Sequence, residues 1–243
     1  MDRRAVTTKA LCTGLIGVLL LAVGCNKSVS GSGNVTSTPV PVPASGFSGL
    51  EVSNAFDVTV SFGDEESVTL RVDDNVVGHL DVGVSEGTLH LGLESGTSVR
   101  DATLHADVTA RSLSRIDVSG ASAVHLSDAL TGSKVEVVVS GAGRLDGMAG
   151  VDLANIELSG ASNANLTGSA GRLQVTGSGA SKLDAVKLQV SDLTIDLSGA
   201  SKAEVSVTGS ISAGVSGASS LTYRGSPEFT RRDVSGGSSI SAA

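Results

Sequence analysis

The sequence predicts an all-β protein: a right-handed parallel β-helix, or solenoid, with an N-terminal β segment that begins or caps it. The first observation is a near-copy of the tetrapeptide Ser-Gly-Ala-Ser, repeated at intervals of 18 to 21 residues. The second is the alternation of apolar residues around each copy, which is the period of a strand. The third is composition, because 31 glycines, no tryptophan and 2% aromatic residues suit a thin aliphatic core. The copies begin at Ser119, Ser140, Ser159, Ser178, Ser198, Ser216 and Ser235.

Residues 1–24 are expected to be a lipoprotein signal peptide. Arg3, Arg4 and Lys9 precede an uncharged run, residues 10–24, that is too short to span a bilayer and ends in small residues. Its end, Leu-Ala-Val-Gly followed by Cys25, resembles the bacterial lipoprotein signal box. That resemblance implies cleavage before Cys25 and acylation of this cysteine, with palmitate-type chains. The alternative is an ordinary secretory cleavage site beside an incidental cysteine.

Residues 25–46 are rich in Ser, Gly, Pro and Val, so we expect a flexible tether. Cys12 leaves with the signal, which makes Cys25 the last cysteine and rules out a disulfide within the mature chain. Two or three acyl chains would hold it stably in a bilayer. Position 26 is Asn instead of Asp, which by resemblance to Gram-negative sorting favours the outer membrane. The expected location is therefore the cell envelope, lipid-anchored, in a Gram-negative bacterium.

Residues 47–112 carry two hairpin-like signals. Apolar residues alternate over 56–62, a polar turn follows at 63–66, and alternation resumes over 68–72. The same pattern recurs over 80–84 and 89–93 around the turn at 85–87. An uncovered end of a β-helix is a sheet edge that recruits other chains. We therefore expect this segment to begin or cap the solenoid.

Four runs in this segment resemble a known family. They are Phe47-Ser48-Gly49-Leu50-Glu51-Val52, Ala55-Phe56-Asp57-Val58-Thr59-Val60, Val68-Thr69-Leu70-Arg71-Val72 and Gly87-Thr88-Leu89-His90-Leu91. Together they look like the opening of the bacterial family named putative auto-transporter adhesin, head GIN domain. That family similarly repeats strand-Ser-Gly-small corners in its later half, so the resemblance covers about residues 47–238. It implies a β-helical envelope protein without established catalysis.

Residues 113–243 are expected to form seven coils, each with one Ser-Gly-Ala-Ser corner. At about 3.3 Å per extended residue, 19 residues trace a perimeter of roughly 60 Å, which suits a triangular coil of three short strands. The usual hand of parallel crossovers favours a right-handed coil. The corner glycines supply backbone angles that a Cβ would penalise. We expect the corner alanines to point inward, where a small side chain fits a sharp turn.

Acidic residues stand two positions before the corner serine in alternate coils: Asp117, Glu157, Asp196 and Asp233. With coils about 4.8 Å apart, neighbouring acids would lie roughly 9.6 Å apart. That touches the upper edge of the separation in inverting glycosidases. The same spacing avoids like charges directly opposite each other, and it recurs along the stack, whereas an active site occurs once. We expect structural spacing or weak ligand contact and no catalytic pair.

A sparse basic strip is predicted four positions past the corner serine. Arg144, Lys182 and Lys202 occupy it, among uncharged neighbours such as Asn163 and Ser220. Such a repetitive surface could suit an extended glycan or a partner protein. The alternative is a soluble face that resists aggregation.

Other chemistry is not predicted. The chain lacks a GxSxG elbow, HExxH, a P-loop and paired-cysteine metal motifs, so we expect no catalytic residue, metal or cofactor. The four histidines, at 79, 90, 105 and 125, are scattered, and we expect solvated or locally bonded side chains. Asp73-Asp74-Asn75 lacks the glycine and distal glutamate of a calcium loop and is expected to be a turn. Without residues 1–24 the chain keeps 17 − 3 = 14 basic and 25 − 1 = 24 acidic residues. With no basic run, this charge argues against nucleic acid as a partner.

The sequence therefore predicts a non-enzymatic, lipid-anchored envelope protein that presents a rigid β-helical surface for adhesion or envelope interaction. Its expected partners are the membrane, through acylated Cys25, and a glycan or an envelope protein. One alternative is a polysaccharide-binding or polysaccharide-cleaving β-helix protein. Another is a structural envelope factor that self-associates through its last coil. The oligomeric state is left open.

Overall fold

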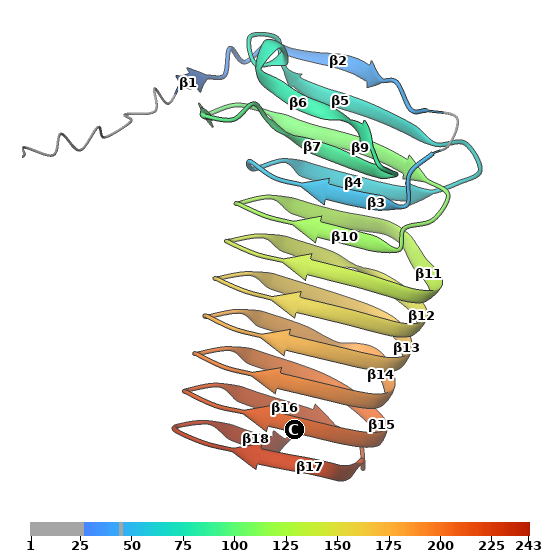
Figure 1. Cartoon of the computed structure of the whole chain (residues 1–243), viewed down its shortest axis with the longest axis vertical. Coiled ribbons are helices and arrows are strands. Elements are labelled where there is room, and N and C mark those ends of the chain that lie inside the picture. Colours follow the sequence, from blue (N-terminus) through green and yellow to red (C-terminus); the bar gives the residue numbers. More distant parts are fainter. Residues whose placement is uncertain (1–26, 44–45) are drawn as a thin grey trace, which may run out of the picture.

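The computed structural model describes residues 27–43 and 46–243. Strands make up most of this part of the chain, and it contains no α-helix. No helix within it is long and apolar enough to cross a membrane. The strands build a β-solenoid of about seven turns, which confirms the predicted parallel β-helix (Figure 1).

The solenoid proper is built from strands that each pair in parallel with the next coil. Most coils contain one long strand that bends round the core, where we had expected three short strands. The inward alternation slips at the bend, for example between the buried residues Val151 and Ala154. The strands are β10 (Arg115–Val118), β11 (Ala123–Val139), β12 (Arg144–Leu158), β13 (Asn163–Gly177), β14 (Lys182–Leu197), β15 (Lys202–Val215), β16 (Ser220–Arg224), β17 (Glu228–Val234) and β18 (Ser239–Ala242).

The Ser-Gly-Ala-Ser corners stack directly on one another. All seven corner glycines have φ between +67° and +77°, a region that favours glycine. The carbonyl of Gly141 accepts a 2.7 Å hydrogen bond from the N–H of Ala161 in the next coil, and the other corners repeat this bond. A Cβ on Gly160 would lie 2.6 Å from the carbonyl oxygen of Gly141. Glycine is therefore required twice, by the backbone angle and by the closeness of the corner above.

The inner side of the corner carries serine, which corrects our expectation for alanine. The corner alanines are exposed, whereas the fourth residue of the corner points inward. Five such serines are at most 2% exposed: Ser122, Ser162, Ser181, Ser201 and Ser219. Ser201 donates to the carbonyl of Ser198 at 2.8 Å and accepts from Ser181 at 3.1 Å. Hydrogen bonds thus satisfy much of a polar column beside an aliphatic core that runs from Phe47 to Ile240.

The N-terminal segment both begins and caps the stack. β3 (Gly49–Val52) and β4 (Asp57–Phe62) form a coil parallel to β10 and β11. The next coil outward comes from later sequence, because β7 (Thr88–Leu93) pairs with β3 and β9 (Leu104–Ala110) pairs with β4. β6 (Leu80–Ser85) is joined to the cap by a short 3-10 helix (Val77–His79) and pairs antiparallel with β7, as the second hairpin signal predicted.

The first predicted hairpin is wrong. β5 (Ser67–Asp73) does not pair with β4, because β9 lies between them, parallel to β4 and antiparallel to β5. Two strands with a third between them are about 9.6 Å apart. A link of four residues, 63–66, can span that distance at about 3.3–3.6 Å per residue. A short polar turn therefore does not by itself specify a hairpin.

The expected flexible tether is also corrected in its described part. β1 (Lys27–Ser30) pairs in parallel with β8 (Thr97–Arg100), and β2 (Val35–Val40) pairs antiparallel with β5. The predicted turn at residues 73–75 binds the segment that links β1 to β2. The buried Asp73 carboxylate accepts the N–H groups of Gly33 at 2.7 Å and Thr103 at 2.6 Å. Asn75 donates to the carbonyl of Ser30 at 2.7 Å. Local polarity suggested a coil, but these long-range bonds order the segment.

Candidate ligand-binding face

The four predicted acids lie in one column on the outer face of the strands that precede the corners. The register alternates Asp117, Val138, Glu157, Thr176, Asp196, Gly214 and Asp233 from coil to coil. The structure therefore brings the four together along the axis, with one uncharged residue between each pair. Their role in ligand contact stays a prediction.

The column continues into the N-terminal segment, which the sequence pattern did not reveal. Glu51 is the direct register neighbour of Asp117, and His90 is the neighbour of Glu51 on its other side. Nδ1 of His90 lies 2.9 Å from Oε2 of Glu51. Burial raises the pKa of the Asp117 carboxyl, Arg115 at 3.3 Å opposes this rise, and the negative charge of Glu51 adds to it. The rule of alternate coils therefore fails at this end of the column.

At the other end a single arginine bridges two acids of the column. Arg231 donates to Asp196 at 3.0 Å and to Asp233 at 2.8 Å, and these bonds raise its pKa. Gly214 lies between the two acids in the register. A Cβ at this position would collide with both the Arg231 guanidinium and the Asp196 carboxylate. The glycine thus makes room for the bridge.

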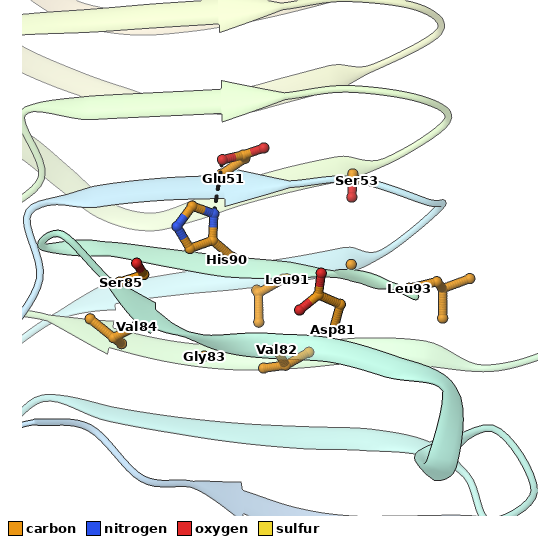
Figure 2. Close-up of a pocket in the computed structure, with 11 residues that line it drawn as sticks. Glu51, Ser53, Asp81, Val82, Gly83, Val84, Ser85, His90, Leu91 and Leu93 are labelled. Carbon is orange, nitrogen blue, oxygen red and sulfur yellow. Dashed lines mark hydrogen bonds and ion pairs between the residues drawn. The ribbon is translucent and has the colours of Figure 1, made fainter. Parts of the chain in front are cut away.

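Three hollows follow this column, and we call them together the groove. The N-terminal hollow, of about 410 Å³, lies over β3, β7 and β6. Figure 2 shows the Glu51–His90 contact in it, with Asp81 on the neighbouring strand β6. The middle hollow, of about 280 Å³, includes Asn155 and Gln174, and the C-terminal hollow, of about 550 Å³, includes Arg231. All three are open to solvent, and side chains of the outer face line them.

The predicted basic strip lies on the other side of the corner, on the face formed by the strands that follow it. Arg144 pairs with Asp146, and Lys202 pairs with Glu204 at 2.8 Å. These hydrogen bonds raise the pKa of Arg144 and Lys202 and lower that of Glu204. Lys182 is the direct register neighbour of Lys202. The basic strip and the carboxylate column therefore do not form one ligand face.

A charge network on this second face was missed by sequence reasoning. It joins the cap to the solenoid through contacts of the Asp57 carboxylate with two histidine rings, His105 at 3.7 Å and His125 at 3.5 Å. The chain order hides it, because the strands that carry these residues stack in an order different from their sequence. The network runs Arg71, Asp107, His105, Asp57, His125, Asp146 and Arg144. Across the described residues, no group of three or more metal-ligating side chains could hold an ion.

Cys25, the predicted lipidation residue, lies outside the described residues. No structural contact therefore bears on its role, which rests on the sequence around it.

Comparison with known proteins identifies relatives of this architecture. The family model described as "Putative auto-transporter adhesin, head GIN domain" matches residues 46–227. No curated protein matches the chain. A crystal structure of a putative adhesin from Bacteroides fragilis has a TM-score of 0.82 at 21% identity, covering 88% of this chain and 100% of that one.

Two further crystal structures from Parabacteroides are similar at 17% identity each. A putative lipid binding protein from Parabacteroides distasonis has a TM-score of 0.72 and covers 89% of this chain and 100% of its own. A putative adhesin from Parabacteroides merdae has a TM-score of 0.70 and covers 89% of this chain and 99% of its own. At this level of identity the likeness shows a shared fold.

Proposed function

Because this chain belongs to the family of putative auto-transporter adhesins, head GIN domain, we propose that it is a lipid-anchored, non-enzymatic envelope protein. It presents a rigid β-helical surface for adhesion or envelope interaction. The observation that supports this proposal best is the uninterrupted stack of corners. Backbone bonds join each coil to the next at the corner and along the strands. A solenoid of this kind keeps outer side chains at a fixed spacing, as an extended binding surface requires.

The lipid anchor is tested by the variant Cys25→Ser, followed by acyl labelling and membrane fractionation. The wild type should carry the label and sediment with membranes, and the variant should lose both properties. The matched control is Cys12→Ser, which changes the other cysteine, within the predicted signal, and should leave anchoring intact. Sedimentation of Cys25→Ser with membranes would contradict the anchor.

The adhesive role is tested on intact cells. A protein that contacts other surfaces must be reachable from outside, so protease added to intact cells should remove it. Full protection from protease would contradict surface adhesion and leave contact with partners inside the envelope.

Binding of lipid within the fold is disfavoured. The described core is filled by Val, Leu, Ile and Ala side chains, with Phe47 and Phe56 at the N-terminal end, in one continuous cluster. The hollows lie on the outer faces and are open to solvent. This supports our proposal that the acyl anchor makes the lipid contact.

A polysaccharide-cleaving enzyme is the second candidate. The column geometry favours it, because Asp117 and Glu157 are two coil spacings apart, roughly 9.6 Å, at the upper edge of the separation in inverting glycosidases. Combined replacement of Asp117, Glu157 and Asp196 by their amides tests this idea. Loss of turnover on a glycan, with an unchanged unfolding transition, would establish the enzyme, and absence of turnover in the wild type would exclude it for that glycan.

A further inference from the structure

The three hollows of the groove are continuous with one another along the solenoid. Thr176 lines both the middle and the C-terminal hollows. Glu51 in the N-terminal hollow is the register neighbour of Asp117, which pairs with Arg115 of the middle hollow. A ligand that filled the groove would therefore be long and would lie along the stacking axis, across successive coils.

In the middle hollow of the groove, the groups available to bind a ligand are uncharged amides and a free carboxylate. Within the described structure, Asn155, Gln174, Thr176 and Glu157 have no hydrogen-bond or ion-pair partner from another side chain. The Asn155 Oδ1 atom is covered and has no hydrogen-bond partner, which is uncommon for a polar atom in a folded protein. A ligand would bond this oxygen only after the side chain turned outward, which would also remove its unsatisfied state. An amide both donates and accepts, and a carboxylate accepts. A ligand that satisfies these groups must itself carry many donors and acceptors.

The charged side chains of the groove disfavour an anionic ligand. Six carboxylates and three arginines line the three hollows. The arginines are already engaged: Arg115 with Asp117 and Glu136, Arg231 with Asp196 and Asp233, and Arg232 with the carbonyl of Ile240. Arg232 keeps its full charge, because its acceptor is a neutral carbonyl, but the six carboxylates still outnumber the three arginines. Phosphate- or uronate-bearing polymers would therefore meet net repulsion.

The middle hollow of the groove lies on a sheet face, which disfavours a peptide strand there, whereas the edge strands β6 and β17 line the two outer hollows. Extended peptides usually add to a sheet through the free backbone groups of an edge. Here the backbone of β11, β12, β13 and β14 is paired on both sides, coil to coil. This middle part of the groove offers a ligand only side chains, which repeat about every 4.8 Å along the axis. This repeat is similar to the rise of one hexose in an extended glycan chain.

We propose that the groove binds an extended, uncharged glycan along the solenoid axis, with Asn155 and Gln174 hydrogen-bonded to its hydroxyl groups. The inference rests on the proposed function and names the class of surface to which the protein adheres. No aromatic residue lines the three hollows, so stacking on sugar rings is missing. Each sugar is therefore held weakly, and binding strength grows with the number of coils contacted.

The test uses the purified described fold, residues 27–243, with immobilised neutral hexose hexasaccharides, linked 1→4 and 1→3, and with a hexa-uronate as the anionic comparison. The double variant Asn155→Ala/Gln174→Ala should weaken binding of a neutral hexasaccharide about tenfold, through the loss of two amide contacts. The matched control is Asn163→Ala/Asn165→Ala, which removes two exposed amides of β13 from the opposite face and should leave affinity unchanged. Equal urea midpoints for both variants would show that folding is intact.

Three results overturn the inference: no binding to any neutral hexasaccharide, equal losses in the two double variants, or binding of the hexa-uronate at least as tight as that of the neutral chains. Each leaves the proposed function standing if the Cys25→Ser variant is still released from membranes. Conversely, glycan binding that depends on Asn155 would stand even if the anchor experiment failed.

Discussion

Replacement of one corner glycine by alanine should destabilise the whole stack, and Gly160 is the position to change. An alanine at φ +72° costs about 1–2 kcal/mol in backbone strain. Its Cβ would also lie 2.6 Å from the carbonyl oxygen of Gly141, a backbone atom that cannot rotate away. Displacing that carbonyl weakens its 2.7 Å bond from Ala161, worth about 0.5–1.5 kcal/mol. We therefore expect Gly160→Ala to lower the free energy of unfolding by about 1.5–3.5 kcal/mol.

Two control variants separate the causes. Gly87 has φ +73° but no atom near its Cβ position, so Gly87→Ala should cost only the strain of about 1–2 kcal/mol. Gly132 has open space and an ordinary φ, so Gly132→Ala should be neutral or stabilise by about 0.4–1 kcal/mol through the unfolded chain.

Urea denaturation of the three variants supplies the free energies. Hydrogen exchange at the Ala161 and Ala180 amides reports the corner locally, which matters because stacked repeats can unfold in parts. If Gly160→Ala costs no more than Gly87→Ala, the contact between stacked corners is not what requires glycine. Destabilisation by Gly132→Ala would show that the local reasoning itself is wrong.

Three further predictions concern buried or clamped polar groups. Ser201→Ala should lower the free energy of unfolding, measured by urea denaturation, by about 1–3 kcal/mol, because it leaves the buried Ser181 hydroxyl without its acceptor. Ser162→Ala should cost less than half as much, because the Ser162 Oγ has no hydrogen-bond partner to lose. Equal costs for the two variants would refute this reasoning. Burial raises the pKa of Asp117, so its contribution is present below its unfolded pKa and is lost as the pH rises through the folded pKa. Asp117→Asn should therefore gain stability relative to wild type, by less than about 1 kcal/mol, at pH 7 but not at pH 3, and a variant less stable at pH 7 would sink the idea. Asp73→Ala leaves two N–H groups unpaired, so limited proteolysis should cut residues 27–40 several times faster than in wild type, and unchanged cleavage would contradict the clamp.

The repeat predicted the stack, because a period of about 19 residues with strand alternation on both sides of each corner suits coils that lie over each other. It also predicted the column of Asp117 and Glu157, since residues at one position relative to a corner share a register. The inward turn of Ser122 was available in the sequence but overlooked. Ser122 has the parity of the buried residues Val124 and Leu126, whereas Ala121 does not.

The N-terminal arrangement was not available in the same way. The placement of β9 between β4 and β5 depends on which strands bury their faces best together, and no local pattern records that choice. The contact of Asp57 with His125 depends instead on the pairing of β4 with β11, two strands far apart in the chain. The order of residues 27–40 likewise depends on Asp73, more than thirty residues later in sequence, as its bond to Gly33 shows.

The pairing of β1 with β8 decides how the molecule would stand on a bilayer. Figure 1 shows β1 beside the capped end of the stack, near the level of β2 and β6. Only Asn26 separates Cys25 from Lys27, and two peptide units reach at most about 7 Å. An acyl chain on Cys25 would thus hold the cap against the headgroups with almost no slack. The seven corners would then stack away from the lipid, and the coil of β17 and β18 would lie farthest from the membrane.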